Sequence, residues 1–157
     1  MKKLFLLFLG VPFLFFGQEL TYVPDDNFEQ ALIDLGYDNL LNDSVTTSIV
    51  DTITFLPISN KNISNLIGIE DFSSLQTVRC SGNQLTELDL SNNLNLQALF
   101  CCGNQLTELN LSNNASLRVL KCGNNEISQL DLSNNNLLIK IILSRLKRHI
   151  IYFLFHF

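Results

Sequence analysis

The chain has 157 residues, enough for one domain, and its apolar fraction of 46% is that of an ordinary globular protein. All 15 acidic residues lie between Glu19 and Asp131, where only four basic residues accompany them, so this block has a net charge of −11. Because phosphate binding needs a basic face, this acidic body argues against a nucleic-acid-binding protein.

Residues 1–17, MKKLFLLFLGVPFLFFG, have the pattern of a secretory signal peptide. Two lysines form a positive start, an apolar run follows, and the small residue Gly17 precedes a predicted mature start near Gln18. The run is too short for a stable transmembrane span, although a retained anchor is the alternative, and no cysteine follows it to carry a lipid. We therefore expect export to the periplasm, the cell surface or the medium of a bacterium.

Residues 18–52 predict an N-terminal helical cap region. The segment FEQALIDLG follows Asp25-Asp26-Asn27, which supplies an N-cap oxygen, and Gly36 ends the helix. An oxygen-rich cluster of residues follows. It is either a calcium-binding site or a solvated acidic loop. The cluster consists of Asp34, Asp38, Asn39, Asn42 and Asp43. The absence of a D-x-[DN]-x-[DN]-G loop with a twelfth-place Glu favours the acidic loop.

Tandem segments of equal length occupy the middle of the chain. They are LQTVRCSGNQLTELDLSNNLN at 75–95, LQALFCCGNQLTELNLSNNAS at 96–116 and LRVLKCGNNEISQLDLSNNNL at 117–137. They share the frame L-x-x-L-x-C-x-x-N-x-L-x-x-L-x-L-x-x-N, and the segment 53–74, longer by a single position, fits its first half. One coil cannot bury its own apolar edge, but stacked coils with parallel strands about 4.8 Å apart can. Residues 53–137 therefore predict a solenoid of about four coils.

The repeated frame resembles the leucine-rich-repeat family in a short bacterial form. The flank TYVPDDNFEQALIDLGYDNLLND and the phrase SNKNISNLIGIEDF are similar to exported repeat proteins of Bacteroidota and, more distantly, to internalins. Asp43-Ser44-Val45 and Asp51-Thr52-Ile53 resemble the short O-glycosylation acceptor of that phylum. The resemblance implies an α/β repeat fold with a helical cap, ligand binding through the strand (concave) face, and further coils with a sorting domain for type IX secretion.

Two rows of asparagine recur with the repeat. One row stands where the chain leaves each strand, and the other stands at the opposite corner of the coil. The rows are Asn83, Asn104 and Asn125, and Asn93, Asn114 and Asn135. A side-chain amide at such a corner both donates and accepts hydrogen bonds, so we expect these residues to satisfy backbone groups of the turn and of the next coil.

Cys80, Cys101 and Cys122 recur once in each repeat and occupy the inward place that Ile58 fills in the first coil. We expect a buried row of free thiols, because free cysteine packs as a small apolar residue and side chains on adjacent rungs are poorly aimed for disulfides. A metal site is disfavoured because the spacing lacks a short C-x-x-C pair, and we expect no cofactor. Cys102 is the exception, since alternation points it outward.

The outward positions of the strand face form the candidate ligand-binding surface. Phe100 is flanked one coil away by Arg79 and Lys121, an aromatic residue between two cations, and Cys102 adds a thiol beside it. We predict that Arg79, Phe100, Cys102 and Lys121 contact a protein or glycan ligand. The alternative is that one exposed phenylalanine and two cations are ordinary surface.

Residues 138–157 depart from the repeat and form an atypical basic, apolar tail. Leu138, Ile141 and Leu143 still fit L-x-x-L-x-L, so a fifth strand is expected to begin before the frame collapses. A truncated or frame-shifted end is the main interpretation, because an uncapped solenoid leaves a strand edge open. Membrane contact through a helix is the alternative. Its polar face would hold Lys140, Ser144, Lys147 and Arg148.

No nucleophile and base are clustered in the sequence, so we do not expect an enzyme. The most economical interpretation is an exported, non-catalytic leucine-rich-repeat binding module that recognises a protein or glycan. The alternatives are a structural spacer from a longer surface adhesin and a membrane-associated protein held by its tail.

Overall fold

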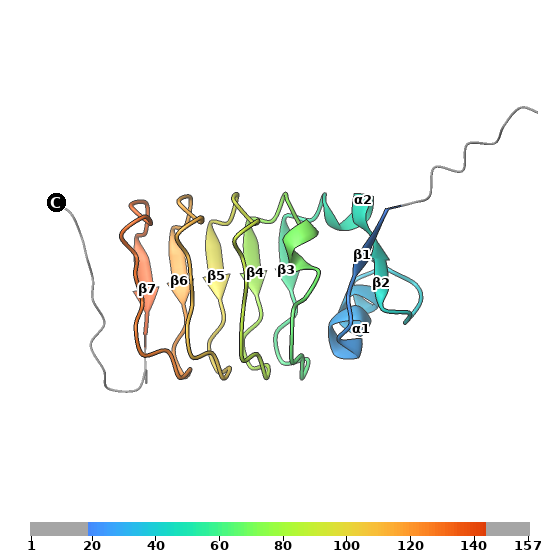
Figure 1. The fold of residues 1–157 in the computed structure, drawn as a ribbon, viewed down its shortest axis with the longest axis horizontal. Coiled ribbons are helices and arrows are strands. Elements are labelled where there is room, and N and C mark those ends of the chain that lie inside the picture. Colours follow the sequence, from blue (N-terminus) through green and yellow to red (C-terminus); the bar gives the residue numbers. More distant parts are fainter. Residues whose placement is uncertain (1–18, 144–157) are drawn as a thin grey trace, which may run out of the picture.

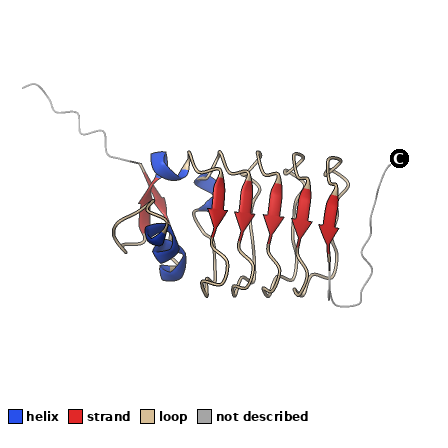
Figure 2. Ribbon diagram, turned by 180° about the vertical axis from the view of Figure 1, so that it is seen from behind, coloured by secondary structure: helices blue, strands red, loops and turns tan. Residues whose placement is uncertain are grey.

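The computed structural model describes residues 19–143, which form a small cap followed by a solenoid (Figures 1 and 2). The cap contains β1 (Leu20–Tyr22), α1 (Asp26–Asp34), β2 (Ser44–Thr46) and α2 (Thr47–Val50). The solenoid contains β3 (Phe55–Pro57), the 3-10 helix η1 (Ile69–Asp71), β4 (Thr77–Arg79), β5 (Ala98–Phe100), β6 (Val119–Lys121) and β7 (Lys140–Ile142). The predicted signal peptide lies outside the described residues.

The five solenoid strands are parallel and lie side by side in chain order, as Figure 1 shows. Val78 pairs with Leu99, and Leu99 pairs with Leu120, so one repeat of the sequence equals one step across the sheet. The slightly longer first coil keeps this register, with Leu56 beside Val78. The predicted leucine-rich-repeat solenoid is therefore confirmed.

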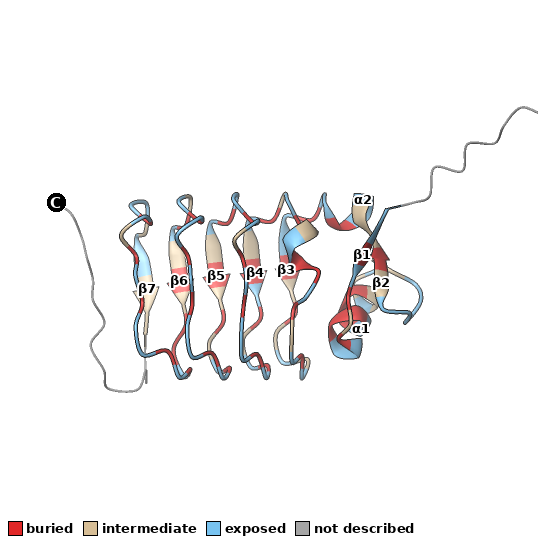
Figure 3. Cartoon of the chain, viewed as in Figure 1, coloured by how far each residue is buried: buried red, intermediate tan, exposed pale blue. Residues whose placement is uncertain are grey.

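The core runs along the inside of the coils, where Figure 3 shows buried bands at matching heights of successive strands. Leu96, Leu99 and Leu106 belong to one coil and are each fully buried at 0% exposure. Burying a leucine side chain contributes about 1.5–3 kcal/mol. Because these contacts form between neighbouring coils, stability accumulates along the stack rather than within any single repeat.

The asparagine row at the ends of the strands is confirmed. Nδ2 of Asn104 donates to the backbone oxygens of Cys80 and Cys101, at 3.1 and 3.0 Å, and its Oδ1 accepts from the N–H of Leu85 at 3.1 Å. Asn83 and Asn125 make the equivalent bonds one coil away on either side. Each amide therefore joins two successive coils.

The second asparagine row is also confirmed, with a different pattern of bonds. Nδ2 of Asn114 donates to the backbone oxygens of Leu90 and Asn93, both at 3.0 Å. Asn93 and Asn135 donate in the same way. The Oδ1 atoms of this row accept no hydrogen bond from the described residues. Each side chain here acts as a donor of two bonds between coils.

Helix α1 begins at the capping residue that the sequence predicts. Oδ1 of Asp25 accepts hydrogen bonds from the backbone N–H groups of Asn27 and Phe28, both at 3.0 Å. Its Oδ2 accepts from the backbone N–H groups of Ser64 and Asn65, at 2.8 and 3.1 Å, and from the Ser64 hydroxyl. One carboxylate therefore both starts the helix and ties it to the first coil.

The cap contains more than the predicted helix. Strands β1 and β2 form an antiparallel pair in which Thr21 faces Val45, a small sheet that no sequence pattern predicted. The carboxylate of Glu29 in α1 is fully buried. It accepts hydrogen bonds from the backbone N–H groups of Asn42, Asp43 and Ser44, at 2.9–3.0 Å. This carboxylate fixes the loop that leads from the helix into β2.

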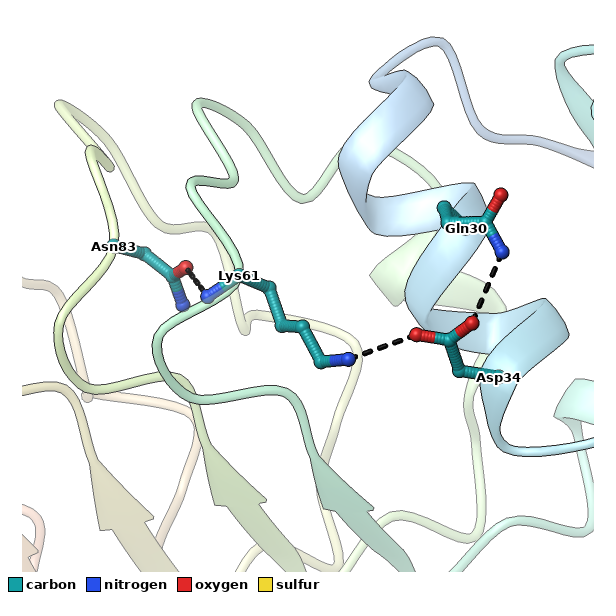
Figure 4. Close-up of polar contacts among 4 residues, drawn as sticks. All are labelled: Gln30, Asp34, Lys61 and Asn83. Atoms are coloured by element: carbon teal, nitrogen blue, oxygen red, sulfur yellow. Dashed lines mark hydrogen bonds and ion pairs between the residues drawn. The ribbon is translucent and has the colours of Figure 1, made fainter.

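Figure 4 shows a second link between α1 and the first coil. Nζ of Lys61 lies 2.8 Å from Oδ2 of Asp34, whose Oδ1 accepts from Gln30 at 3.0 Å. The hydrogen bond from Lys61, followed by that from Gln30, lowers the pKa of Asp34 below its ordinary value. The backbone N–H of Lys61 also donates to Oδ1 of Asn83 at 2.9 Å. Because both charged side chains are exposed, this pair orients the helix and adds little to stability.

Strand β7 lies where a fifth strand is expected, with Lys140 beside Val119 and Ile142 beside Lys121. A tail helix that includes Lys140 is therefore wrong for residues 140–142, because these residues extend the sheet. The rest of that proposed helix, from residue 144 on, lies outside the described residues. Between residues 19 and 143, no helix is both long enough and apolar enough to cross a bilayer.

Candidate functional site

The outer side of the five strands is here called the strand face. The segments that form it contain no acidic residue. These segments, each a strand with its flanking residues, are 53–61, 75–83, 96–104, 117–125 and 138–143. They hold every lysine and arginine of the described part of the chain, while its aspartates and glutamates all lie elsewhere. The positive and negative charges of the solenoid are therefore segregated within each coil.

Four outward side chains form a line across the strands, here called the aromatic–cation stripe: Phe55, Arg79, Phe100 and Lys121. The guanidinium carbon of Arg79 lies 5.3 Å from the ring centroid of Phe55 and 5.2 Å from that of Phe100. Nζ of Lys121 lies 5.1 Å from the centroid of Phe100. Each such contact is worth about 0.5–1 kcal/mol at an exposed site. The structure thus brings together three of the four predicted site residues.

Phe55 was not among the predicted site residues. It pairs with Thr77, and Arg79 pairs with Pro57, so Phe55 and Arg79 meet as diagonal neighbours. The Phe55 side chain is 42% exposed, which makes it part of the accessible surface. Diagonal pairs on adjacent strands lie within reach of aromatic side chains. The repeat frame specifies only direct neighbours, so it gave no signal for this contact.

Cys102, the fourth predicted residue, borders the stripe. It follows Phe100 by two positions, just past the end of β5, and is half-buried. Its backbone oxygen accepts a hydrogen bond from the N–H of Gly82 at 2.8 Å, which holds the turn against the preceding coil.

The three inward cysteines form the predicted row of free thiols. Cys80, Cys101 and Cys122 are all at 0% exposure, stacked like Ile58 in the first coil. Burial raises the pKa of the Cys80 and Cys122 thiols to about 12, and it raises that of Cys101 well above its ordinary value. These thiols are therefore protonated and shielded at physiological pH, which leaves them a packing role.

We expect a membrane-impermeant maleimide to modify Cys102 in the folded protein and all four cysteines in urea, because only Cys102 reaches the surface. Intact-mass measurement before and after unfolding counts the adducts, and peptide mapping places them. The Cys102→Ser variant serves as the control and should take up no reagent while folded. Labelling of Cys80 at the rate of Cys102 would contradict the inward and outward assignment.

A groove of about 1060 Å³ runs along another side of the coils and has the opposite charge. Its carboxylates come from Glu70, Glu87, Asp89, Glu108 and Asp131, and no strand residue lines it. Hydrogen bonds from the backbone and side chain of the serine two positions further on lower the pKa of both Asp89 and Asp131. Within residues 19–143, no group of three or more His, Cys, Asp or Glu is arranged to hold a metal ion.

Comparison with known proteins finds internalins of Listeria monocytogenes. Internalin J of serotype 4b (strain F2365) is 33% identical over 72 residues, which are 46% of this chain and 8% of internalin J. No protein-family model matches the chain.

Two solved internalin structures share the fold. The functional domain of InlJ from Listeria monocytogenes, described as including a cysteine ladder, has a TM-score of 0.71 and 32% identity over 78% of this chain and 28% of that one. The internalin InlF of strain 4b F2365 has a TM-score of 0.74 and 26% identity over 78% of this chain and 37% of that one. The chain is thus an internalin-like leucine-rich-repeat solenoid that spans well under half the length of each relative.

Proposed function

We propose that this protein is an exported, non-catalytic binding module that recognises a ligand through its strand face. The observation that carries the proposal is the aromatic–cation stripe, which places two aromatic rings and two cations in mutual contact on an accessible surface. Aromatic residues and arginine are enriched at binding hot spots, because they contribute large contact area and directed hydrogen bonds. The contacts also hold the stripe in one arrangement before a ligand arrives, which reduces the entropy lost on binding.

Further observations support this function. The likeness to internalins and the signal-peptide pattern of residues 1–17 favour a bacterial protein that works outside the cytoplasm. The leucine-rich-repeat resemblance implies binding through the strand face, which is also where the stripe lies. Among the described residues, every cysteine except Cys102 is buried, and no histidine accompanies Cys102 as a base.

The test is selection of binders from a displayed library of random dodecapeptides. We expect the selected peptides to lose binding to Ala98→Glu, which adds a long, negatively charged side chain to the strand face beside Phe100. They should retain binding to Thr107→Glu, which adds the same side chain at an exposed position outside the strands. The readout is binding of each peptide to the wild type and to both variants, whose folding is checked by circular dichroism.

Equal binding to the wild type and to Ala98→Glu would place the recognition surface elsewhere and overturn the proposal. Failure to find any strand-face binder, whether a peptide or a glycan, would do the same. The chain spans only part of its relatives, so that result would favour the spacer from a longer surface protein.

A further inference from the structure

We infer that the ligand of the strand face is an acidic segment of a protein, whose carboxylates bind Arg79 and Lys121 on either side of Phe100. The inference rests on the proposed function, because it specifies the chemistry of the ligand that this surface takes. Three features of the stripe support it: its unpaired charge, its spacing and the orientation of its aromatic contacts.

The two cations of the aromatic–cation stripe are unpaired. Among the described residues, the ion pair that forms is Lys61 with Asp34, so Arg79 and Lys121 have no carboxylate partner within that part of the protein. A cation that lies over an aromatic ring keeps N–H donors free for a ligand, and a guanidinium carries five of them. With the acidic residues gathered elsewhere on each coil, a negatively charged segment is attracted to this face and repelled by the groove lined by Glu87 and Glu108.

The spacing of the two cations fits a short peptide pattern. Arg79 is on β4 and Lys121 is on β6, two steps across the sheet and so about 10 Å apart at the backbone. In a polyproline II segment, residues i and i+3 share one side and lie about 9 Å apart. A segment with two acids at i and i+3 therefore reaches both cations at once. The backbone between those two acids would then pass over Phe100.

The aromatic contacts favour a protein segment over a glycan. Sugar recognition by an aromatic residue uses an open ring face, on which the sugar stacks. Here Arg79 and Lys121 approach Phe100 from the strands on its two sides, with both cations within 5.2 Å of the ring centroid. Two cations that lie over the Phe100 ring compete with a sugar for its faces, which disfavours stacking of a glycan there.

The test uses the peptides that the library selection yields. We expect strand-face binders to be enriched in two acids at i and i+3, and replacing those acids by their amides should weaken binding at least about tenfold. The double variant Arg79→Gln/Lys121→Gln should show a comparable loss with the acidic peptides. The control Lys61→Gln/Arg118→Gln makes the same change in net charge outside the stripe. Its affinity for the acidic peptides, measured by calorimetry, should stay within about twofold of that of the wild type. The affinity of every variant should fall as the salt concentration rises.

The outcomes separate this inference from the proposed function. Strand-face binders without a preference for acids would overturn the inference and leave the binding function intact. Equal loss in the two double variants would mean that net charge, and not the stripe, attracts the peptides, which also overturns it. If no peptide binds the strand face and an oligogalacturonate binds there instead, the ligand is an anionic glycan and the inference fails.

Discussion

Asn104→Ala is expected to destabilise the protein by about 3–4 kcal/mol, the largest effect of any single substitution considered for this chain. The side chain, 8% exposed, donates to the backbone oxygens of Cys80 and Cys101 and accepts from Leu85. Its removal leaves three backbone groups at the junction of two coils without their partner. Urea denaturation followed by circular dichroism measures the loss.

Two matched variants test whether the loss of stability depends on the number of hydrogen bonds that the side chain makes between coils. Asn114→Ala removes two buried bonds and should cost about 2 kcal/mol, whereas Asn113→Ala removes one exposed bond to Ser91 and should cost under about 1 kcal/mol. Hydrogen exchange in Asn104→Ala should rise in both coils that the amide joins. Equal destabilisation by all three variants would contradict a role for the amide in joining coils.

Asp25→Ala is expected to cost about 3 kcal/mol, because one carboxylate caps α1 and also accepts hydrogen bonds from Ser64 and Asn65 of the first coil. Asp26→Ala is the control. This neighbouring acid is exposed in the first turn of the helix, so its loss should cost under about 1 kcal/mol. The free energy of unfolding in urea distinguishes the two variants, and equal losses would show that Asp25 acts only through its charge near the helix.

The Asp25 contribution should also depend on pH. Burial raises the pKa of this carboxyl, but the hydrogen bonds from Ser64, Phe28 and Asn65 outweigh burial and hold it below the ordinary value of 3.8. A carboxyl whose pKa is lower in the folded state contributes its full stabilisation above the unfolded value and loses it as the pH falls through the folded one. The stability gap between wild type and Asp25→Ala should thus be constant from neutral pH to about pH 5 and narrow below about pH 4. A gap that widens in acid would contradict this assignment.

The repeat frame alone was sufficient to predict the solenoid. A constant repeat length specifies which side chains stack on which, so the inward row of Cys80, Cys101 and Cys122 follows from counting along the chain. The same count predicts the asparagine rows and the outward positions of Arg79, Phe100 and Lys121. The helix cap follows from a local signal, an acidic residue before an apolar helical pattern.

Contacts between segments of unrelated sequence were beyond that reasoning. The pairing of β1 with β2 and the bonds from Asp25 to Ser64 join residues that share no repeat, so no period predicts them. The contact of Phe55 with Arg79 depends on a diagonal offset between two strands, and the repeat frame specifies only direct neighbours.

The sequence by itself therefore determined the fold, the buried thiols and the two rows of asparagine, because a regular repeat converts local alternation into long-range order. Only the tertiary structure decided how the cap docks, which charges remain unpaired and that four side chains form a continuous aromatic–cation stripe. Those features depend on distances across the sheet and between cap and coil, and such distances are set by packing of the whole chain.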